Sequence, residues 1–247
     1  KSICGNDFEF TSIFAGIGGI TTKEDEENVA QLLRQLPGAS ENTKIIARND
    51  MEIALASGLC GDGIALIVGT GMVAFGKKGE ETHKCAGWGY KEGETGSGYD
   101  LGMQAIRMMI RAYDHRIEGT AFTEEVFKTL GMNKVTDIVA IINNLWGKRT
   151  KIAALAPLVT KHANLNDPHA LEIIKIATNE VFLAIKGVYK SLNMQSPPLV
   201  IIGSLGNAPG VYRNMIIERV LELDPNINIT APKIDPAQAA AFLALKS

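Results

Sequence analysis

Glycine is concentrated in one short stretch of this chain and separates two regions of different pattern. Between Gly87 and Gly102 there are six glycines, at positions 87, 89, 93, 96, 98 and 102. This density is too high for a regular element and is typical of a loop that backbone or a ligand approaches closely. Short apolar runs separated by turns precede it, and mostly helical patterns follow it. This order predicts a mixed α/β fold.

The region before the glycine-rich stretch has the pattern of strands, helices and tight turns. Apolar runs at 12–15 and 43–48 predict strands, and apolar side chains at helical spacing predict helices over 23–36 and 52–59. Gly61-Asp62-Gly63 is a flexible joint, where we predict a boundary between two lobes. Beyond it, β-rich runs over 64–88 predict a meander of antiparallel hairpins.

The region after the glycine-rich stretch is predominantly helical. Helices are predicted near 103–115, 123–130, 135–145 and 152–162, and a long amphipathic helix begins after Asp167-Pro168. A buried strand at 199–202, a helix at 211–223, a strand near 227–230 and a terminal helix at 236–245 follow.

Composition excludes several classes of protein. The chain of 247 residues is 46% hydrophobic and 21% charged, values of a folded globular protein. Its net charge is −2 and it has no basic block, so nucleic acid is not expected as a partner. The longest apolar runs are far short of the roughly 20 residues of a membrane span, and no signal peptide is visible.

Cysteine and histidine do not form a metal-binding or disulfide pattern. Cys4, Cys60 and Cys85 are widely spaced and odd in number, which favours a reducing, cytoplasmic location. The four histidines, at positions 83, 115, 162 and 169, lack metal-ligand spacing, so no metal ligands are predicted.

One candidate catalytic residue follows the second predicted strand. Asp50 lies at the carboxyl end of that strand, where α/β sheets usually present ligand-binding groups. Its carboxylate could accept a proton from a substrate hydroxyl. An Asn-Asp pair after a strand is also a common start of a helix, with Asn49 as the N-cap. Both interpretations remain open.

Two short glycine turns are candidate phosphate sites. Gly69-Thr70-Gly71 follows an apolar strand and could present bare N–H groups to a phosphate, although such a turn is also that of a simple hairpin. Gly203-Ser204-Leu205-Gly206 lies between a buried strand and a helix and could cradle a nucleotide. Alone, each motif fits many proteins.

The glycine-rich stretch contains side chains suited to a sugar. Trp88 supplies an apolar surface, and Glu94 can accept hydrogen bonds from paired hydroxyls. The alternative is an Ω-type surface loop. Glycine at this density costs conformational entropy that an inert loop does not require, which favours a function.

Taken in order, these motifs and the alanine-rich stretch that begins at Pro236 resemble one family. The chain resembles the BadF/BadG/BcrA/BcrD-type ATPases, and within them the N-acetylglucosamine kinase branch of the actin and sugar-kinase superfamily, from about Phe14 to the C-terminus. The resemblance implies two ribonuclease-H-like α/β lobes around a cleft. The first lobe would comprise residues 1–62 and the C-terminal helix 235–247, and the nucleotide-binding lobe residues 63–234.

The resemblance also implies an activity and roles for single residues. An ATP-dependent kinase of an amino sugar or hexose is expected, with Mg²⁺ bridging the phosphates, Asp50 as the base and a homodimer as a plausible assembly. The residues expected to bind ATP are Gly69, Thr70, Gly71, Gly203 and Ser204. The residues expected near the sugar are Asn49, Asp50, Trp88, Gly89 and Glu94.

The sequence departs from the family pattern at two places. The family usually reads Gly-Asp-Glu-Gly-Ser-Gly where this chain has Gly93-Glu94-Thr95-Gly96-Ser97-Gly98. No Asp-Gly-Gly-Gly-Thr-Lys-Thr-like first phosphate loop is found, so the first lobe is expected to be incomplete and the natural protein longer. Two alternatives are an ATPase that activates a redox enzyme through an iron–sulfur cluster, and a non-catalytic nucleotide- or sugar-binding protein.

Overall fold

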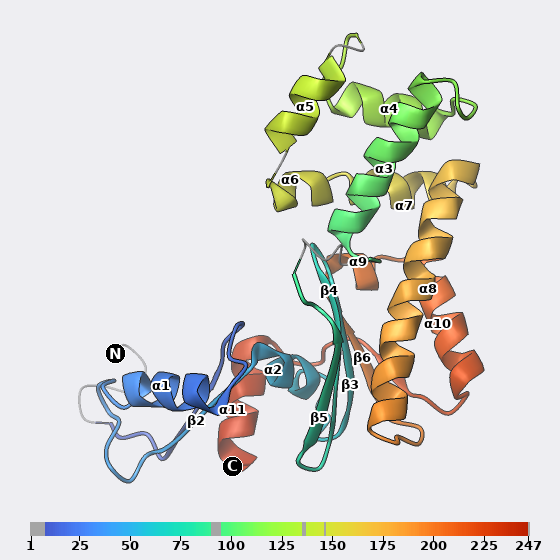
Figure 1. Cartoon of the computed structure of the whole chain (residues 1–247). Helices are drawn as coiled ribbons and strands as arrows, with labels where there is room; N and C mark the ends of the chain where they lie inside the picture. The colour runs from blue at the N-terminus through green and yellow to red at the C-terminus, as the bar shows by residue number, and fades with distance from the viewer. Residues whose placement is uncertain (1–7, 90–94, 135–136, 146, 247) are drawn as a thin grey trace.

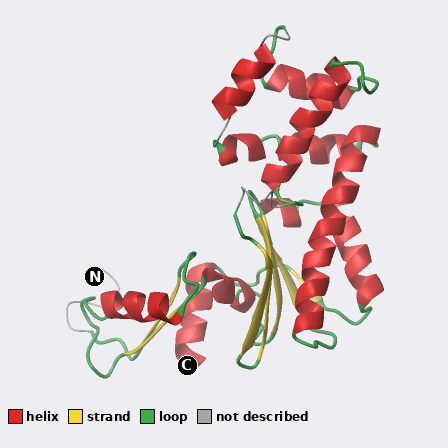
Figure 2. Ribbon diagram, in the orientation of Figure 1, coloured by secondary structure: helices red, strands yellow, loops and turns green. Residues whose placement is uncertain are grey.

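The computed structural model describes residues 8–89, 95–134, 137–145 and 147–246, which form two β-sheets and the helices around them (Figure 1). The smaller sheet has the strand order β1-β2 and the larger the order β5-β4-β3-β6-β7. Helices lie beside both sheets and extend beyond one end of the larger sheet (Figure 2). The mixed α/β architecture is as predicted.

The smaller sheet consists of β1 (Ser12–Gly16) and β2 (Lys44–Arg48), which are parallel. The helix α1 (Lys23–Leu33) connects them and begins at Thr22, whose side chain accepts a hydrogen bond from the Asp25 N–H. The C-terminal helix α11 (Pro236–Lys246) packs on β1 and α2, and the Ser12 hydroxyl donates to the Ala244 carbonyl at 2.6 Å. Segments from the two ends of the described chain therefore pack together in this part of the molecule.

The larger sheet contains the predicted hairpins. The strands β3 (Gly63–Val68), β4 (Met72–Lys78) and β5 (Glu81–Ala86) are antiparallel neighbours. The strands β6 (Leu199–Ile202) and β7 (Ile229–Thr230) extend the sheet from β3 in the parallel direction. A crossover of more than a hundred residues separates β5 from β6, and most of the helices lie within it.

Helices cover both faces of the larger sheet. On one face α8 (Pro168–Ser191) packs against β4 and β5, and α10 (Val211–Leu223) lies beside α8. On the other face Leu55 of α2 (Asp50–Ala56) packs with Phe75 and Val200. Because α2 also contacts β1 and α11, it connects the two sheets. The lobe boundaries at 62 and 63 and at 234 and 235 stay a prediction.

The crossover contains a helical region above the sheet in Figure 1. Its helices are α3 (Gly98–Tyr113), α4 (Ala121–Thr129), α5 (Asp137–Leu145), α6 (Arg149–Ala153) and α7 (Ala156–Asn164). The first helix was expected near 103, but α3 begins at Gly98. Gly98 and Gly102, which were predicted to belong to a loop, lie in this helix and allow other segments to pack closely against it. A Cβ atom on Gly98 would lie 2.8 Å from the Gly69 carbonyl oxygen, and one on Gly102 would lie 2.0 Å from that of Ile152.

The helix predicted over 152–162 is wrong in one respect, because the chain breaks it at Ala154 and Leu155. Pro157 has no N–H to donate to a preceding turn and is tolerated in the first turn of a helix, so α7 starts afresh at Ala156. The resulting bend turns α6 and the start of α7 around one cavity.

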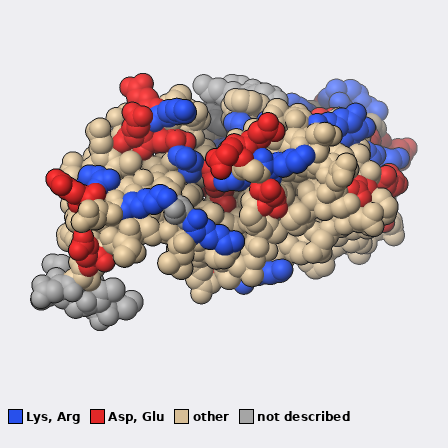
Figure 3. All heavy atoms as spheres, turned by 90° about the horizontal axis from the view of Figure 1, so that it is seen from below, with Lys and Arg blue, Asp and Glu red and all other residues tan. Residues whose placement is uncertain are grey.

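Charge is mixed over the face shown in Figure 3, where acidic and basic side chains alternate without a large area of one sign. This distribution agrees with the small net charge. In the described part of the chain, no helix combines the length and the apolar character needed to cross a membrane.

Candidate functional site

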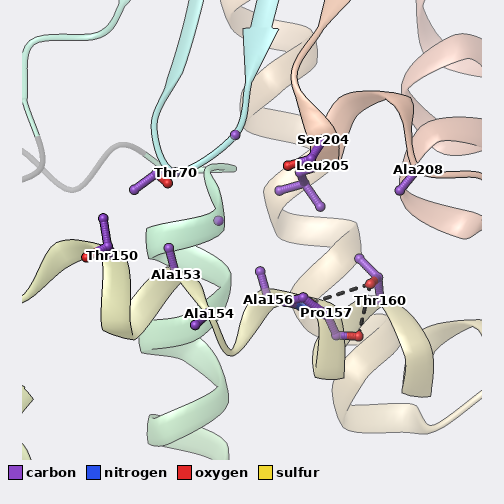
Figure 4. A pocket seen from close by; sticks show the side chains of 12 residues that line it. Thr70, Thr150, Ala153, Ala154, Ala156, Pro157, Thr160, Ser204, Leu205 and Ala208 are labelled. Atoms are coloured by element: carbon purple, nitrogen blue, oxygen red, sulfur yellow. Dashed lines mark hydrogen bonds between the residues drawn. The ribbon is translucent and has the colours of Figure 1, made fainter.

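Two cavities meet at the turn between β3 and β4. The first, of about 330 Å³, is called the donor cavity here, and its lining residues are Gly69, Thr70, Gly98, Thr150, Ala153, Ala154, Ala156, Pro157, Thr160, Ser204, Leu205 and Ala208 (Figure 4). The second, of about 400 Å³, is called the acceptor cavity, and its lining residues are Gly18, Gly19, Thr21, Asn49, Asp50, Met51, Ile67, Gly69, Thr70, Gly71, Met72, Val73, Lys84, Gly87 and Arg149. Gly69 and Thr70 line both cavities, so a chemical group bound at this turn would contact both cavities.

The shared turn is held rigidly by the backbone of α3. The Gly69 carbonyl accepts a hydrogen bond from the Gly98 N–H at 2.7 Å, and the Thr70 carbonyl accepts one from the Tyr99 N–H at 3.1 Å. At this turn Thr70 lines both cavities. The predicted motif is therefore a hairpin turn and a cavity wall at once.

The second predicted phosphate turn lies against the first. Gly203 has a φ of +100°, and a Cβ atom there would be 2.2 Å from the Val68 carbonyl oxygen. Only glycine fits this position, and it brings Ser204 into the wall of the donor cavity beside Thr70. The prediction of a glycine turn over residues 203–206 is wrong in one detail, because Ser204–Asn207 forms the short helix α9.

The pair after β2 begins a helix, so the interpretation of Asn49 as an N-cap is confirmed, whereas the role of Asp50 as a base stays a prediction. Asn49 is the N-cap of α2: its side-chain oxygen accepts from the Met51 N–H at 3.1 Å, and its amide donates to the Ile20 carbonyl at 2.9 Å. Asp50 is the first residue of α2, exposed, and faces the acceptor cavity. A Cβ atom on Gly18 would lie 3.2 Å from its Oδ2, so glycine there leaves space beside the carboxylate.

Two basic residues of the acceptor cavity were not predicted. Lys84 lies on β5 and Arg149 begins α6, and both line the cavity that contains Asp50. Their separation in sequence gives no motif that would have identified them. Cationic side chains beside a phosphate turn can stabilise the charge of a transferring phosphoryl group.

Only some of the expected sugar-binding residues line the acceptor cavity. Asn49 and Asp50 line the acceptor cavity, whereas Trp88 is 71% exposed and lies under the Lys84 ammonium, 3.7 Å from its ring centroid. Gly89 is next to it with a φ of +109°. The expectation for Glu94 falls outside the described residues.

The described end of the glycine-rich stretch is fixed by a buried polar network. The Tyr212 hydroxyl donates to the Gly96 carbonyl at 2.6 Å, the Gly96 N–H donates to the Asp100 carboxylate at 2.9 Å, and the Ser97 hydroxyl caps α3. Burial raises the pKa of Asp100, and burial beside that carboxylate raises the pKa of Tyr212. The network ties the start of α3, and with it the shared turn, to α10.

Metal-ligating side chains are sparse around the site. Among the described residues, no three His, Cys, Asp or Glu side chains come close enough to hold a metal ion. Cys60 and Cys85 are free thiols whose pKa values are raised by burial. A cluster-binding cysteine set is therefore not seen in the described part of the chain.

Proteins of known structure share this fold. A Chromobacterium violaceum protein assigned as an N-acetylglucosamine kinase superimposes with a TM-score of 0.71 at 24% identity, over 96% of this chain and 78% of that one. The ROK hexokinase of Thermus thermophilus gives a TM-score of 0.52 at 14% identity, over 95% of this chain and 78% of that one. These likenesses confirm the expected sugar-kinase fold class.

Comparison of sequences is more specific. The chain is 32% identical over 244 residues to the N-acetylmuramic acid/N-acetylglucosamine kinase of Clostridium acetobutylicum, a match that covers 96% of this chain and 78% of that protein. It is 30% identical over 246 residues to the N-acetyl-D-glucosamine kinase of Dictyostelium discoideum, covering 96% and 76%. The model of the BadF/BadG/BcrA/BcrD ATPase family matches residues 5–244, and the chain belongs to this family.

Proposed function

We propose that this protein transfers the γ-phosphate of ATP to a hydroxyl of an amino sugar, with N-acetylglucosamine as the first candidate. The observation that carries the proposal is the junction of the two cavities at Gly69 and Thr70. A triphosphate in the donor cavity and a sugar in the acceptor cavity would meet at this turn. Both sequence relatives carry N-acetylglucosamine in their names, which supports this choice of sugar.

Asp50 is proposed to act as the general base. It is the one carboxylate among the described residues that line the acceptor cavity, and its position at the start of α2 is fixed by the Asn49 cap. In the proposed step the acceptor oxygen attacks the γ-phosphorus, the bond to the β,γ-bridging oxygen breaks, and ADP leaves with that electron pair. The hydroxyl proton passes to the Asp50 carboxylate.

The remaining chain contributes positioning and charge. Thr70 and Ser204 supply hydroxyl donors beside the phosphates, and Lys84 and Arg149 supply positive charge on the acceptor side. Mg²⁺ usually keeps few protein ligands and binds phosphate oxygens, which fits a site whose described lining contains one carboxylate, that of Asp50. When bound, the ion would neutralise charge on the β- and γ-phosphates.

Asp50→Asn tests the base directly. We expect it to lower kcat by about 10²- to 10⁴-fold while leaving the fold intact, because the amide cannot take the proton. Release of ADP is measured with N-acetylglucosamine, N-acetylmuramic acid, glucosamine and glucose. Asp114→Asn is the matched control, because Asp114 ends α3 on the surface and pairs with Arg116.

The outcomes separate the remaining functions. Sugar-dependent ADP release that Asp50→Asn abolishes supports the kinase. Hydrolysis of ATP without a sugar requirement contradicts it and favours a partner-activating ATPase. Nucleotide binding without turnover favours a binding protein. We further propose that the protein is a homodimer and lies in the cytoplasm. Light scattering of the purified protein tests the dimer, and fractionation of cells tests the location.

A further inference from the structure

The donor cavity changes character along its length. In Figure 4 Thr70 lies at one end, while Thr160 and Ala208 lie at the other. The phosphates of a nucleotide belong at the Thr70 end, because that end opens into the acceptor cavity. The base must then lie toward the far end, against Pro157 and Ala208.

The far end offers small aliphatic surfaces, and several of its polar groups have hydrogen-bond partners within the protein. The Thr160 hydroxyl donates to the Pro157 carbonyl at 3.1 Å, a contact drawn in Figure 4. The Asn207 and Ala208 N–H groups donate to the Gly203 and Ser204 carbonyls at 3.1 and 3.0 Å. Among the described residues that line the donor cavity, none has a side-chain amide, carboxylate, amine or guanidinium.

Side chains of this kind, and free backbone N–H and C=O groups, recognise the edge of a base by hydrogen bonds. Adenine, guanine and hypoxanthine present similar ring faces and differ in the donors and acceptors at their edges. A site that hydrogen-bonds such an edge rejects the wrong base by about 10⁴-fold or more, whereas an apolar site discriminates by about 10²-fold or less. The free energy of contact with aliphatic side chains depends on the ring area that is buried. All purines have similar ring areas, and the rings of pyrimidines are smaller.

We propose that the donor site accepts purine nucleoside triphosphates as a class, GTP and ITP as well as ATP. The inference rests on the proposed kinase function, because it concerns the donor of that reaction. The chemistry is the same for each donor. The acceptor oxygen bonds to the γ-phosphorus, the bond to the β,γ-bridging oxygen breaks, GDP or IDP leaves with the electron pair, and Asp50 takes the proton.

The experiment measures kcat/KM of the full chain with ATP, GTP, ITP, CTP and UTP at saturating N-acetylglucosamine. We expect GTP and ITP to lie within about tenfold of ATP, and CTP and UTP to be weaker. A preference for ATP over GTP of about 10²-fold or more overturns the proposal, because an apolar site does not supply it.

Displacement of a fluorescent methylanthraniloyl-ADP by ADP, GDP and IDP, without sugar, separates this inference from the kinase function. Comparable displacement without sugar phosphorylation supports the donor site and contradicts the kinase. Displacement by ADP alone overturns the inference and leaves the kinase standing. Failure of every nucleotide to bind overturns both.

Thr160→Val is the matched variant, since valine has the shape of threonine without its hydroxyl. We expect the ratio of kcat/KM for ATP to that for GTP to stay within about threefold of the wild-type ratio. A larger change shows that the Thr160 hydroxyl reads the base edge and overturns the proposal.

Discussion

At the scale of single residues, Thr70 has the most consequential position. Its side chain lines both cavities, and its backbone carbonyl is already bonded to the start of α3. Thr70→Val removes the hydroxyl and keeps the shape of the side chain. We expect kcat for sugar phosphorylation to fall by about 10²-fold, as when one positioned donor to a transition state is lost.

The control for this substitution is Thr129→Val, which alters an exposed threonine at the end of α4. Unchanged kcat in Thr70→Val, with Thr129→Val also unchanged, would contradict a role for the Thr70 hydroxyl in the reaction.

Gly98 has no Cβ atom, and this allows the start of α3 to contact the shared turn. An added Cβ would lie 2.8 Å from the Gly69 carbonyl oxygen, so α3 and the turn must move apart. We expect Gly98→Ala to lower the free energy of unfolding by about 1–3 kcal/mol, as in other overpacked sites, and to raise KM for ATP. Urea denaturation and steady-state kinetics measure the two effects.

Gly61→Ala is its control, because an added Cβ there meets no atom within 4 Å. Stability of Gly98→Ala equal to that of Gly61→Ala would show that the contact with Gly69 tolerates the extra carbon.

At the scale of elements, the capping box of α1 makes part of the stability depend on pH. The Asp25 carboxylate accepts from the Thr21 and Thr22 N–H groups, and these bonds lower its pKa from 3.8 to about 2. A depressed folded-state pKa means that the stabilisation is complete above pH 3.8 and is lost as pH falls towards 2. The carboxylate also suits the positive end of the helix.

We therefore expect Asp25→Asn to be less stable than the wild type at neutral pH and to converge with it as pH falls from 4 to about 2. Urea denaturation across this range measures the difference. Glu27→Gln, on the same helix but outside the capping box, is the control. A pH-independent gap for Asp25→Asn would contradict the argument.

At the scale of the whole molecule, an ion-pair network joins the two sheets through α2. The Lys77 ammonium on β4 lies 3.1 Å from Glu52 Oε2, and the Arg48 guanidinium on β2 lies 3.7 Å from Glu52 Oε1. Glu52 is 13% exposed in its side chain, so solvent screens it less than a surface carboxylate. The network lies two residues from Asp50 and fixes the helix that carries it.

A double-mutant cycle with Lys77→Met and Glu52→Gln measures this link. We expect a coupling of about 1 kcal/mol in the free energy of unfolding, which declines in 1 M salt as the pair is screened. Additive effects of the two substitutions at low salt would show that the pair does not hold the sheets together.

Sequence patterns predicted the order of most strands and helices and, among the residues that line the two cavities, Asn49, Asp50, Gly69, Thr70, Gly71 and Ser204. Sequence patterns predicted the structure correctly where neighbouring residues determine it. Examples are the β-branched runs of β3 and β6, Asn49 as a cap, and the glycines at Gly69 and Gly203. The prediction of a loop is wrong at Gly98 and Gly102, which lie in α3. Glycine is needed there because a distant segment packs closely against the helix.

Which residues line the same cavity depends on tertiary packing. Lys84 and Arg149 come to Asp50 from a strand and a helix far away in sequence, and α6 and α7 form the donor cavity because the chain bends before Pro157. Such proximity depends on how sheets and helices pack, and packing joins residues without regard to their spacing along the chain. Periodicity and turn residues record only the local conformation, so they predict the elements and not the distances between them.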